Sequence, residues 1–148
     1  HEASRQLAKL GPAAREAAPA LGAALADQDK RVRVHSAKCL AELGADAKPA
    51  LDSMIAGLGE TDPDGRYYLV KALSKIDLDS RHVNAVPALT RLMSDENPKV
   101  RYYAVKCVKA IGPAAKSAIP SLARLASDPD KDVRDLARSA TNRLQKQK

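Results

Sequence analysis

The residues that could do metal or thiol chemistry are few in this sequence, and their spacing does not suit such chemistry. The three histidines, His1, His35 and His82, share no metal-ligand spacing with each other or with the two cysteines, Cys39 and Cys107. Zinc sites place these residue types in close, defined pairs. We therefore expect neither a bound metal nor a cofactor.

Catalytic motifs are also missing. The segment DPDKD at 128–132 resembles the start of a calcium-binding loop, but it has no glycine at the sixth place and no glutamate at the twelfth. Acidic residues directly before a helix serve as its cap. There is no nucleophile elbow, glycine-rich phosphate loop or recognisable pair of catalytic carboxylates. We expect a protein that is not an enzyme, so that any enzymatic chemistry would come from residues outside this chain.

Charge and aromatic recognition are the chemistry that remains. Three lysines stand five residues after an arginine of a repeated segment, and tyrosines stand one residue after it in two of the copies. Tyrosine is large, rigid and polar-tipped, a type enriched at binding hot spots, and lysines add charge complementarity toward an acidic partner. Arg5 takes the place of the lysine in a first, incomplete copy. The candidate partner-binding residues are Arg5, Lys38, Tyr67, Lys71, Tyr102 and Lys106.

The segment that carries these residues is written four times. The copies are PKVRYYAVKCVKAIG at 98–112, KRVRVHSAKCLAELG at 30–44, DGRYYLVKALSKID at 64–77 and KDVRDLARSATNRLQ at 131–145. One arginine in each copy fixes the register, and the separations are 33, 35 and 33 residues: Arg33, Arg66, Arg101 and Arg134. A period in this range predicts stacked pairs of helices.

Counting from the arginine divides the second helix of each pair into two faces. At about 100° per residue, positions minus one, three, seven and ten fall on one side and predict a buried stripe. The stripe comprises Val32, Gly65, Val100, Val133, Ser36, Leu69, Ala104, Ala137, Leu40, Leu73, Val108, Thr141, Leu43, Ile76, Ile111 and Leu144. Positions one and five point away from it, and we expect Val70 and Val105 to lie between their two columns in solvent. In the last copy Asp135 and Ser139 replace the aromatic residue and the lysine.

The first helix of each pair has its own signature. A proline recurs before each helix core, and an acidic turn precedes each second helix, where carboxylates cap free N–H groups and complement the helix dipole. We expect the first such helix at about residues 14–26, with Pro19 near its start. The prolines are Pro19, Pro49, Pro87 and Pro120, and the acidic turns contain Asp27 and Asp29, Asp62 and Asp64, Asp95 and Glu96, and Asp128 and Asp130.

These patterns resemble HEAT repeats, in particular the short HEAT-like repeats of phycobilin lyases. The resemblance rests on GPAAREAAPAL at 11–21, GPAAKSAIPSL at 112–122 and the acidic turn followed by Val-Arg and an alanine-rich helix. It implies an all-α fold, a right-handed alpha-alpha superhelix or solenoid of about four helix pairs plus a truncated N-terminal helix. It also implies that the second helices line the concave surface.

The expected organisation is a single repeat domain over 1–148, with a truncated helix at 1–10 and repeats at about 14–44, 46–76, 80–111 and 114–145. We expect it to be a piece of a larger protein. Family members serve mostly as scaffolds. The family also includes alkylpurine DNA glycosylases, which the absence of tryptophan argues against, and lyases acting on tetrapyrroles, which nothing beyond the repeat supports.

Composition limits the core and the partners. With no Trp, no Phe and four Tyr, the core must be aliphatic, and no apolar run is long enough to span a membrane. Cys39 and Cys107 take a position that holds alanine in the other copies, which predicts small buried residues. They would lie roughly 20 Å apart, because packed helices are about 10 Å apart, and this is too far for a disulfide.

Three interpretations of the lysine and tyrosine columns follow from the charge. Residues 131–148 hold six basic and two acidic residues, so +4 of the net charge of +7 lies at this end. The columns could be an ordinary solvated helix face. They could form a groove for an acidic or extended segment of a partner protein or of the same parent chain, which is the function we expect. Alternatively, the lysines could bind a nucleic-acid backbone together with Arg134, Arg138 and Arg143.

Overall fold

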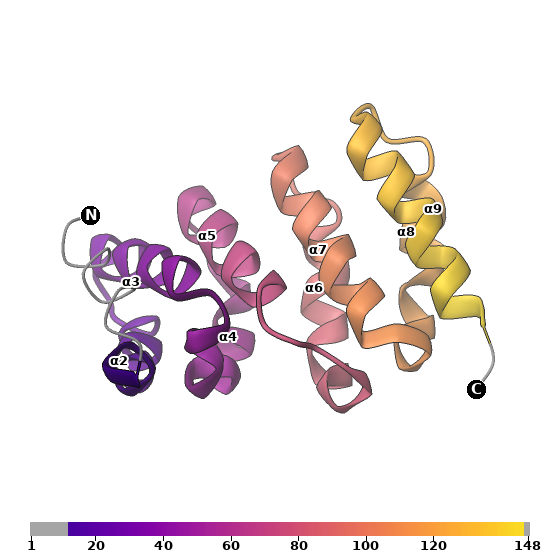
Figure 1. Ribbon diagram of the computed structural model, residues 1–148. Helices are drawn as coiled ribbons and strands as arrows, with labels where there is room; N and C mark the ends of the chain where they lie inside the picture. Colours follow the sequence, from indigo (N-terminus) through magenta and orange to yellow (C-terminus); the bar gives the residue numbers. More distant parts are fainter. Residues whose placement is uncertain (1–11, 147–148) are drawn as a thin grey trace. The chain divides into compact units, whose positions relative to one another are not determined.

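The computed structural model describes residues 12–146, and every regular element in this range is an α-helix or a 3₁₀ helix (Figure 1). The all-α, HEAT-like prediction is confirmed. The expected helix at 1–10 lies outside the described residues. In chain order the elements are α2 (Pro12–Ala24), α3 (Lys30–Leu43), η1 (Gly44–Ala50), α4 (Leu51–Ala56), η2 (Gly57–Gly59), α5 (Pro63–Ser74), η3 (Ser80–Ala85), α6 (Val86–Leu92), α7 (Pro98–Ile111), η4 (Gly112–Ala118), α8 (Ile119–Leu125) and α9 (Lys131–Gln145).

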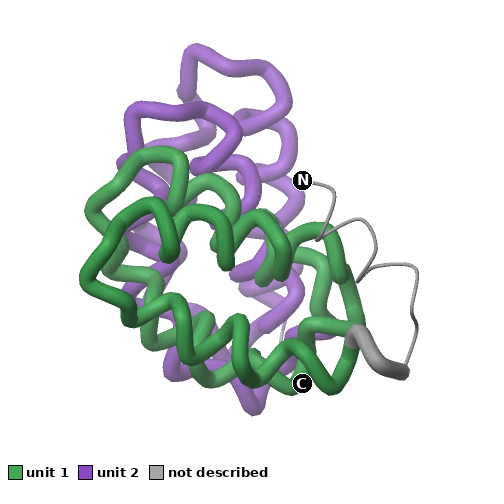
Figure 2. The backbone as a smooth tube through the Cα atoms, turned by 90° about the vertical axis from the view of Figure 1, so that its left-hand side faces the viewer, with its two compact units in different colours: residues 1–76 green, residues 77–148 purple. Residues whose placement is uncertain are grey.

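The helices group into two compact units, residues 1–76 and 77–148 (Figure 2). In unit 1 the second helices α3 and α5 pack against each other, and in unit 2 α7 and α9 do the same. Each second helix therefore meets a second neighbour besides its own first helix, as stacked repeats require.

Each unit is built by the same contacts. In unit 1, Arg33 Nε lies 2.8 Å from Glu60 Oε1, and Lys75 Nζ donates to the Ala41 carbonyl at 2.9 Å. In unit 2 the counterparts, 68 residues further on, are Arg101 with Asp128 and Arg143 with the Lys109 carbonyl. One contact joins the N-terminal ends of two second helices and the other joins their C-terminal ends. Together they fix the register within each unit.

The arginine that marks each repeat holds the turn before its own helix. Arg33 Nη1 donates to the carbonyls of residues 27 and 28, at 2.9 and 3.1 Å. Arg101 and Arg134 bind the carbonyls six and five residues before them in the same way, and Arg66 Nη1 donates to the Thr61 carbonyl at 2.7 Å. The residue that defines the repeat thus satisfies carbonyl groups of the turn that precedes its helix.

The acidic turns cap three of the second helices as predicted, and each cap stands four residues before the arginine that marks the repeat. Asp29 and Asp130 accept from N–H groups of the first turns of α3 and α9, and Asp62 does so for α5. In the third copy Asn97 replaces the acid as the cap of α7. The residue two places before each cap accepts the N–H of the cap itself: Asp27, Glu60, Asp95 and Asp128.

The core is aliphatic, and the predicted stripe is largely buried. Cys39 and Cys107 are free and buried, as expected. The prediction of burial was wrong for one member of the stripe, Val32, which is 37% exposed. Val70 and Val105, expected in solvent, are 0% exposed. The reason is geometric: each second helix packs against both its first helix and a neighbouring second helix, so its buried arc is wider than a single stripe.

The prolines show where sequence reasoning misplaced the first helices. Pro87 and Pro120 each stand at the start of an α-helix, where a missing N–H costs little. Pro49 is the last residue but one of the 3₁₀ helix η1, just before α4. Pro19, however, lies in the middle of α2, because α2 begins at residue 12.

Candidate functional site

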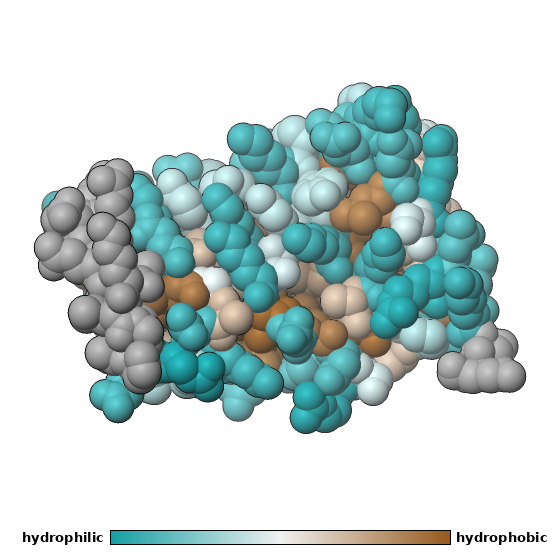
Figure 3. Space-filling view, in the orientation of Figure 1, coloured by the Kyte–Doolittle hydropathy of each residue, from teal (hydrophilic) through white to brown (hydrophobic). Residues whose placement is uncertain are grey.

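The candidate lysines and tyrosines lie on the second helices, outside the aliphatic core. In unit 1, Lys38, Tyr67 and Lys71 are half-buried, and in unit 2 Tyr102 is half-buried and Lys106 is exposed. Arg5, the remaining candidate, lies outside the described residues. Figure 3 shows hydrophilic side chains over much of the face in view, with apolar residues between them.

In unit 1 the lysines and the tyrosine rings contact each other. The Tyr67 and Tyr68 ring centroids are 5.1 Å apart. Lys71 Nζ lies 5.5 Å from the Tyr67 centroid, and Lys38 Nζ lies 5.8 Å from the Tyr68 centroid. Both ammonium groups are within the range of a cation–π attraction. We call Lys38, Tyr67, Tyr68 and Lys71 the lysine–tyrosine face of unit 1.

Unit 2 carries a shorter version of this face on α7. The rings of Tyr102 and Tyr103 meet edge to face, with centroids 5.6 Å apart, and Lys106 follows on the same helix. On α9 the corresponding positions are Asp135 and Ser139. Tyr102, Tyr103 and Lys106 form the lysine–tyrosine face of unit 2.

The lysines of these faces lack acidic partners. Within residues 12–146, no carboxylate oxygen lies within 4.0 Å of the ammonium groups of Lys38, Lys71 or Lys106. Other lysines of the chain do have such partners, for example Lys131 with Asp135 at 2.7 Å. The faces therefore present positive charge that no carboxylate among residues 12–146 neutralises through an ion pair.

A hollow of about 460 Å³ lies between α3 and α5 in unit 1. Lys38 and Tyr68 line it together with Val34 and His35. Its rim carries two further cations and two carboxylates: Lys30, Arg31, Asp62 and Asp64. Charge, an aromatic ring and a concave shape coincide in this hollow.

Sequence reasoning missed several residues of this hollow. Tyr68 is not among the residues predicted from the sequence, and His35 is considered there only as a possible metal ligand. Both occupy position two of the repeat, which faces the adjacent second helix across the hollow. The pair of consecutive tyrosines could have indicated this role. Two consecutive side chains on a helix point in different directions, so the second ring faces a different neighbour from the first.

The histidines and carboxylates outside the faces have structural roles. His35 Nε2 lies 3.5 Å from Cys39 Sγ, and His82 Nδ1 accepts the Asp79 N–H. The hydrogen bond from Arg81 lowers the pKa of Asp79 to about 2, and burial raises the pKa of the Cys107 thiol to about 12. No group of three or more metal-binding side chains occurs in the described part of the chain.

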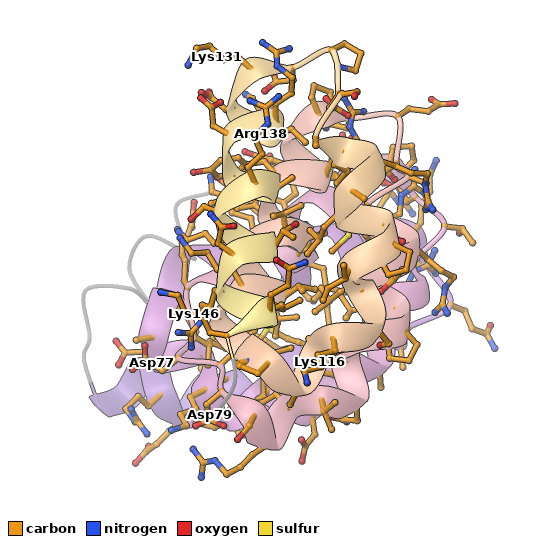
Figure 4. All side chains as sticks on the ribbon, turned by 90° about the vertical axis from the view of Figure 1, so that its right-hand side faces the viewer. Asp77, Asp79, Lys116, Lys131, Arg138 and Lys146 are labelled. Carbon is orange, nitrogen blue, oxygen red and sulfur yellow. The ribbon has the colours of Figure 1, made fainter. Side chains whose placement is uncertain are left out.

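The basic end of the chain is engaged in internal contacts. Figure 4 shows Lys131, Arg138 and Lys146 along α9. Arg138 Nη2 donates to the Ala126 carbonyl at 3.0 Å, and Arg143 Nε donates to the Lys109 carbonyl at 2.6 Å. The arginines that the nucleic-acid interpretation invoked thus hold the ends of α7 and α8.

The stacked helix pairs define a helical-repeat protein of the HEAT and armadillo class, a fold that typically serves as a protein-binding scaffold. The family model for HEAT repeats matches residues 51–142. The chain belongs to the HEAT repeat family. Between residues 12 and 146, no helix is both long and apolar enough to cross a bilayer.

Solved structures agree on the fold. A designed armadillo repeat protein superposes with a TM-score of 0.76 at 22% identity, covering 95% of this chain and 69% of that one. A related design in complex with the peptide (KR)4 gives 0.76 at 19% identity, with the same coverage. The CpcE–CpcF complex of phycocyanin lyase from Nostoc sp. PCC7120 gives 0.63 at 24% identity, covering 93% and 86%. A search of curated proteins gave no match. At these identities the likeness establishes the fold alone.

Proposed function

We propose that this chain is a non-enzymatic scaffold that binds an acidic, extended segment of a partner protein on the lysine–tyrosine faces of its second helices. The observation that carries the proposal is the state of Lys38, Lys71 and Lys106. Each is held on a helix outside the core, and none has a carboxylate partner among the described residues. A partner with carboxylates supplies what these sites lack.

The tyrosines give the faces an energetic anchor. Exposed ion pairs alone contribute little to affinity, typically below about 1 kcal/mol each. Half-buried tyrosine rings contribute more, because they bury large apolar area with few rotatable bonds. We therefore assign affinity mainly to Tyr67 and Tyr102, and assign selection of an acidic partner to the lysines.

A solved structure with the same kind of fold supports peptide binding, although its peptide is basic. A designed armadillo repeat protein forms a complex with the basic peptide (KR)4. The lysine–tyrosine faces of this chain carry cations, so the peptide that complements them is acidic. The basic peptide becomes a control that this chain should not bind.

Nucleic acid is the alternative partner of the same cations. The contacts of α9 argue against nucleic-acid binding, because three of its arginines already donate hydrogen bonds to backbone carbonyls. These are Arg134, Arg138 and Arg143. Freeing these donors for phosphates would expose the ends of neighbouring helices. Binding to DNA or RNA would also depend steeply on salt.

The test is a pair of double variants measured against a labelled octaglutamate peptide. Changing both tyrosines to alanine (Tyr67→Ala with Tyr102→Ala) should weaken binding by about tenfold or more, the effect of losing binding anchors. The matched phenylalanine pair retains the rings and should stay within about threefold of the parent. Helical circular dichroism should be the same in all three proteins. Unchanged binding in the alanine pair contradicts the proposal.

A further inference from the structure

We infer that the hollow between α3 and α5 is a subsite for one carboxylate side chain of the acidic segment, and that it selects a carboxylate over a phosphate. This inference rests on the proposed function and adds the chemistry of one position within it. The hollow has a volume of about 460 Å³, which is large enough to receive a side chain or a small group. All of its lining residues belong to unit 1.

Two of the three basic side chains of the hollow have a carboxylate partner. Lys30 Nζ lies 3.9 Å from Asp62 Oδ1, and Arg31 is held by two side-chain hydrogen bonds to Asp29. The contact with Asp29 raises the pKa of Arg31, so this pair stays ionised. Lys38 is the cation of the hollow that has no carboxylate within 4.0 Å among the described residues. Lys38 is therefore the cation of the hollow that an incoming carboxylate would pair with.

The position of Lys38 is fixed by its surroundings. The side chain is half-buried, and its ammonium group lies over the Tyr68 ring at 5.8 Å. A cation held in this way loses little side-chain entropy when an anion binds. Val34, half-buried on the same helix, offers an apolar surface for the methylene groups of a glutamate.

Two carboxylates make the hollow selective. Asp62 caps α5, and Asp64 follows it on the rim. A side chain with one negative charge balances Lys38, whereas a phosphate near pH 7 carries about two and would meet these carboxylates. Repulsion of this kind is a common source of specificity. Glutamate peptides should therefore bind more tightly than phosphoserine peptides.

The first experiment tests the subsite with matched lysine variants of the full chain. Lys38→Gln should weaken the octaglutamate peptide by about fivefold, the loss of one fixed charge partner. Lys48→Gln removes an exposed lysine of the same unit, outside the hollow, and should change binding by less than about twofold. In two-dimensional NMR of the parent, the amide signals of α3 and α5 should shift on titration with the peptide.

The outcomes separate the subsite from the proposed function. If Lys38→Gln and Lys48→Gln behave alike while the tyrosine-to-alanine pair still loses binding, the subsite is overturned and the proposed function stands. If the parent shows no binding of the acidic peptide at low salt, both are overturned. Loss of binding in Lys38→Gln alone supports the subsite.

The second experiment tests the selection. The parent should bind octaglutamate at least about threefold more tightly than a peptide with phosphoserine at alternate positions. In Asp64→Asn this preference should shrink, because one rim charge is gone; Asp64 gives only its backbone N–H to the cap of α5, so the helix should stay intact. Tighter binding of the phosphopeptide by the parent would overturn the selection. An unchanged preference in Asp64→Asn would overturn the role of the rim.

Discussion

At the scale of single residues, the most regular feature of the chain is structural. The arginine at the start of each second helix binds the carbonyls of the preceding turn, and within each unit the first such arginine also reaches an acid of the next repeat. In unit 2, Arg101 Nη2 donates to Asp128 Oδ2 at 2.9 Å, and Nε lies 2.9 Å from Oδ1 without the angle of a hydrogen bond. The side chain of Asp128 is 5% exposed.

This burial gives the first prediction about stability. Asp128→Asn should lower the free energy of unfolding by about 2 kcal/mol or more, because Arg101 stays partly buried without its charge partner. Asp135→Asn is the matched control, since the Asp135 pair with Lys131 is exposed and should leave stability within error of the parent. Urea unfolding followed by circular dichroism measures both. Equal effects would show that Asp128 does not hold the repeats together.

The same residue gives a prediction about pH. Burial alone would raise the pKa of Asp128, but hydrogen bonds from Arg101 and the Asp130 N–H outweigh burial, so the pKa lies below its usual value. A lowered folded-state pKa stabilises the fold above the unfolded value of about 3.9, and this stabilisation is lost as pH falls through the folded value. The stability gap between parent and Asp128→Asn should thus be widest near neutral pH and narrow in acid. A constant gap from about pH 7 to pH 3 would contradict the assignment.

At the scale of elements, the ends of the second helices stabilise the fold, as the buried stripes of these helices do. Gly44 and Gly112 end α3 and α7 with positive φ, at 60° and 85°, where a side chain is strained. A Cβ at Gly112 would also lie 3.2 Å from Arg143 Nη2, whereas a Cβ at Gly44 would meet nothing within 4 Å. A side chain is therefore strained by the positive φ at both positions, and at Gly112 it would also crowd Arg143.

A pair of alanine variants separates these costs. Gly44→Ala should lower the free energy of unfolding by about 1 kcal/mol, the cost of positive φ with a side chain. Gly112→Ala should cost more, about 2 kcal/mol, because it also crowds the guanidinium that binds the end of α7. Thermal and urea unfolding of the two variants measure the difference. A smaller loss at Gly112 than at Gly44 would argue against the Arg143 contact.

Helix type, register and most of the buried stripe follow from the sequence because they depend on local spacing. Position four misled the prediction: Val70 and Val105 are 0% exposed, since burial there depends on a neighbouring helix that the spacing within one helix does not reveal. For the same reason the role of Tyr68 was missed. The candidate site was found as a set of residue types, but the pairing of Lys38 with Tyr68 needed the packing of α3 against α5.

At the scale of the whole molecule, many residues of unit 1 have a counterpart of the same type 68 positions later in unit 2, and others do not. This repetition accounts for the recurrence of Cys39 as Cys107 and of Lys38 as Lys106. It does not account for the tyrosines. The counterparts of Tyr67 and Tyr68 are Asp135 and Leu136, so the tyrosine pairs are additions to the common plan. They recur instead at the spacing of 35 residues that separates Arg66 from Arg101.

The central claim is that the uncompensated lysines select an acidic partner. The direct test is fluorescence anisotropy of three labelled probes, octaglutamate, (KR)4 and a short single-stranded DNA, with the parent and with a variant in which Lys38, Lys71 and Lys106 are glutamine. We predict that octaglutamate binds the parent, that salt and the triple substitution weaken it by about tenfold, and that (KR)4 does not bind. Binding of (KR)4 as tight as that of octaglutamate, or tighter binding of DNA, would contradict the account.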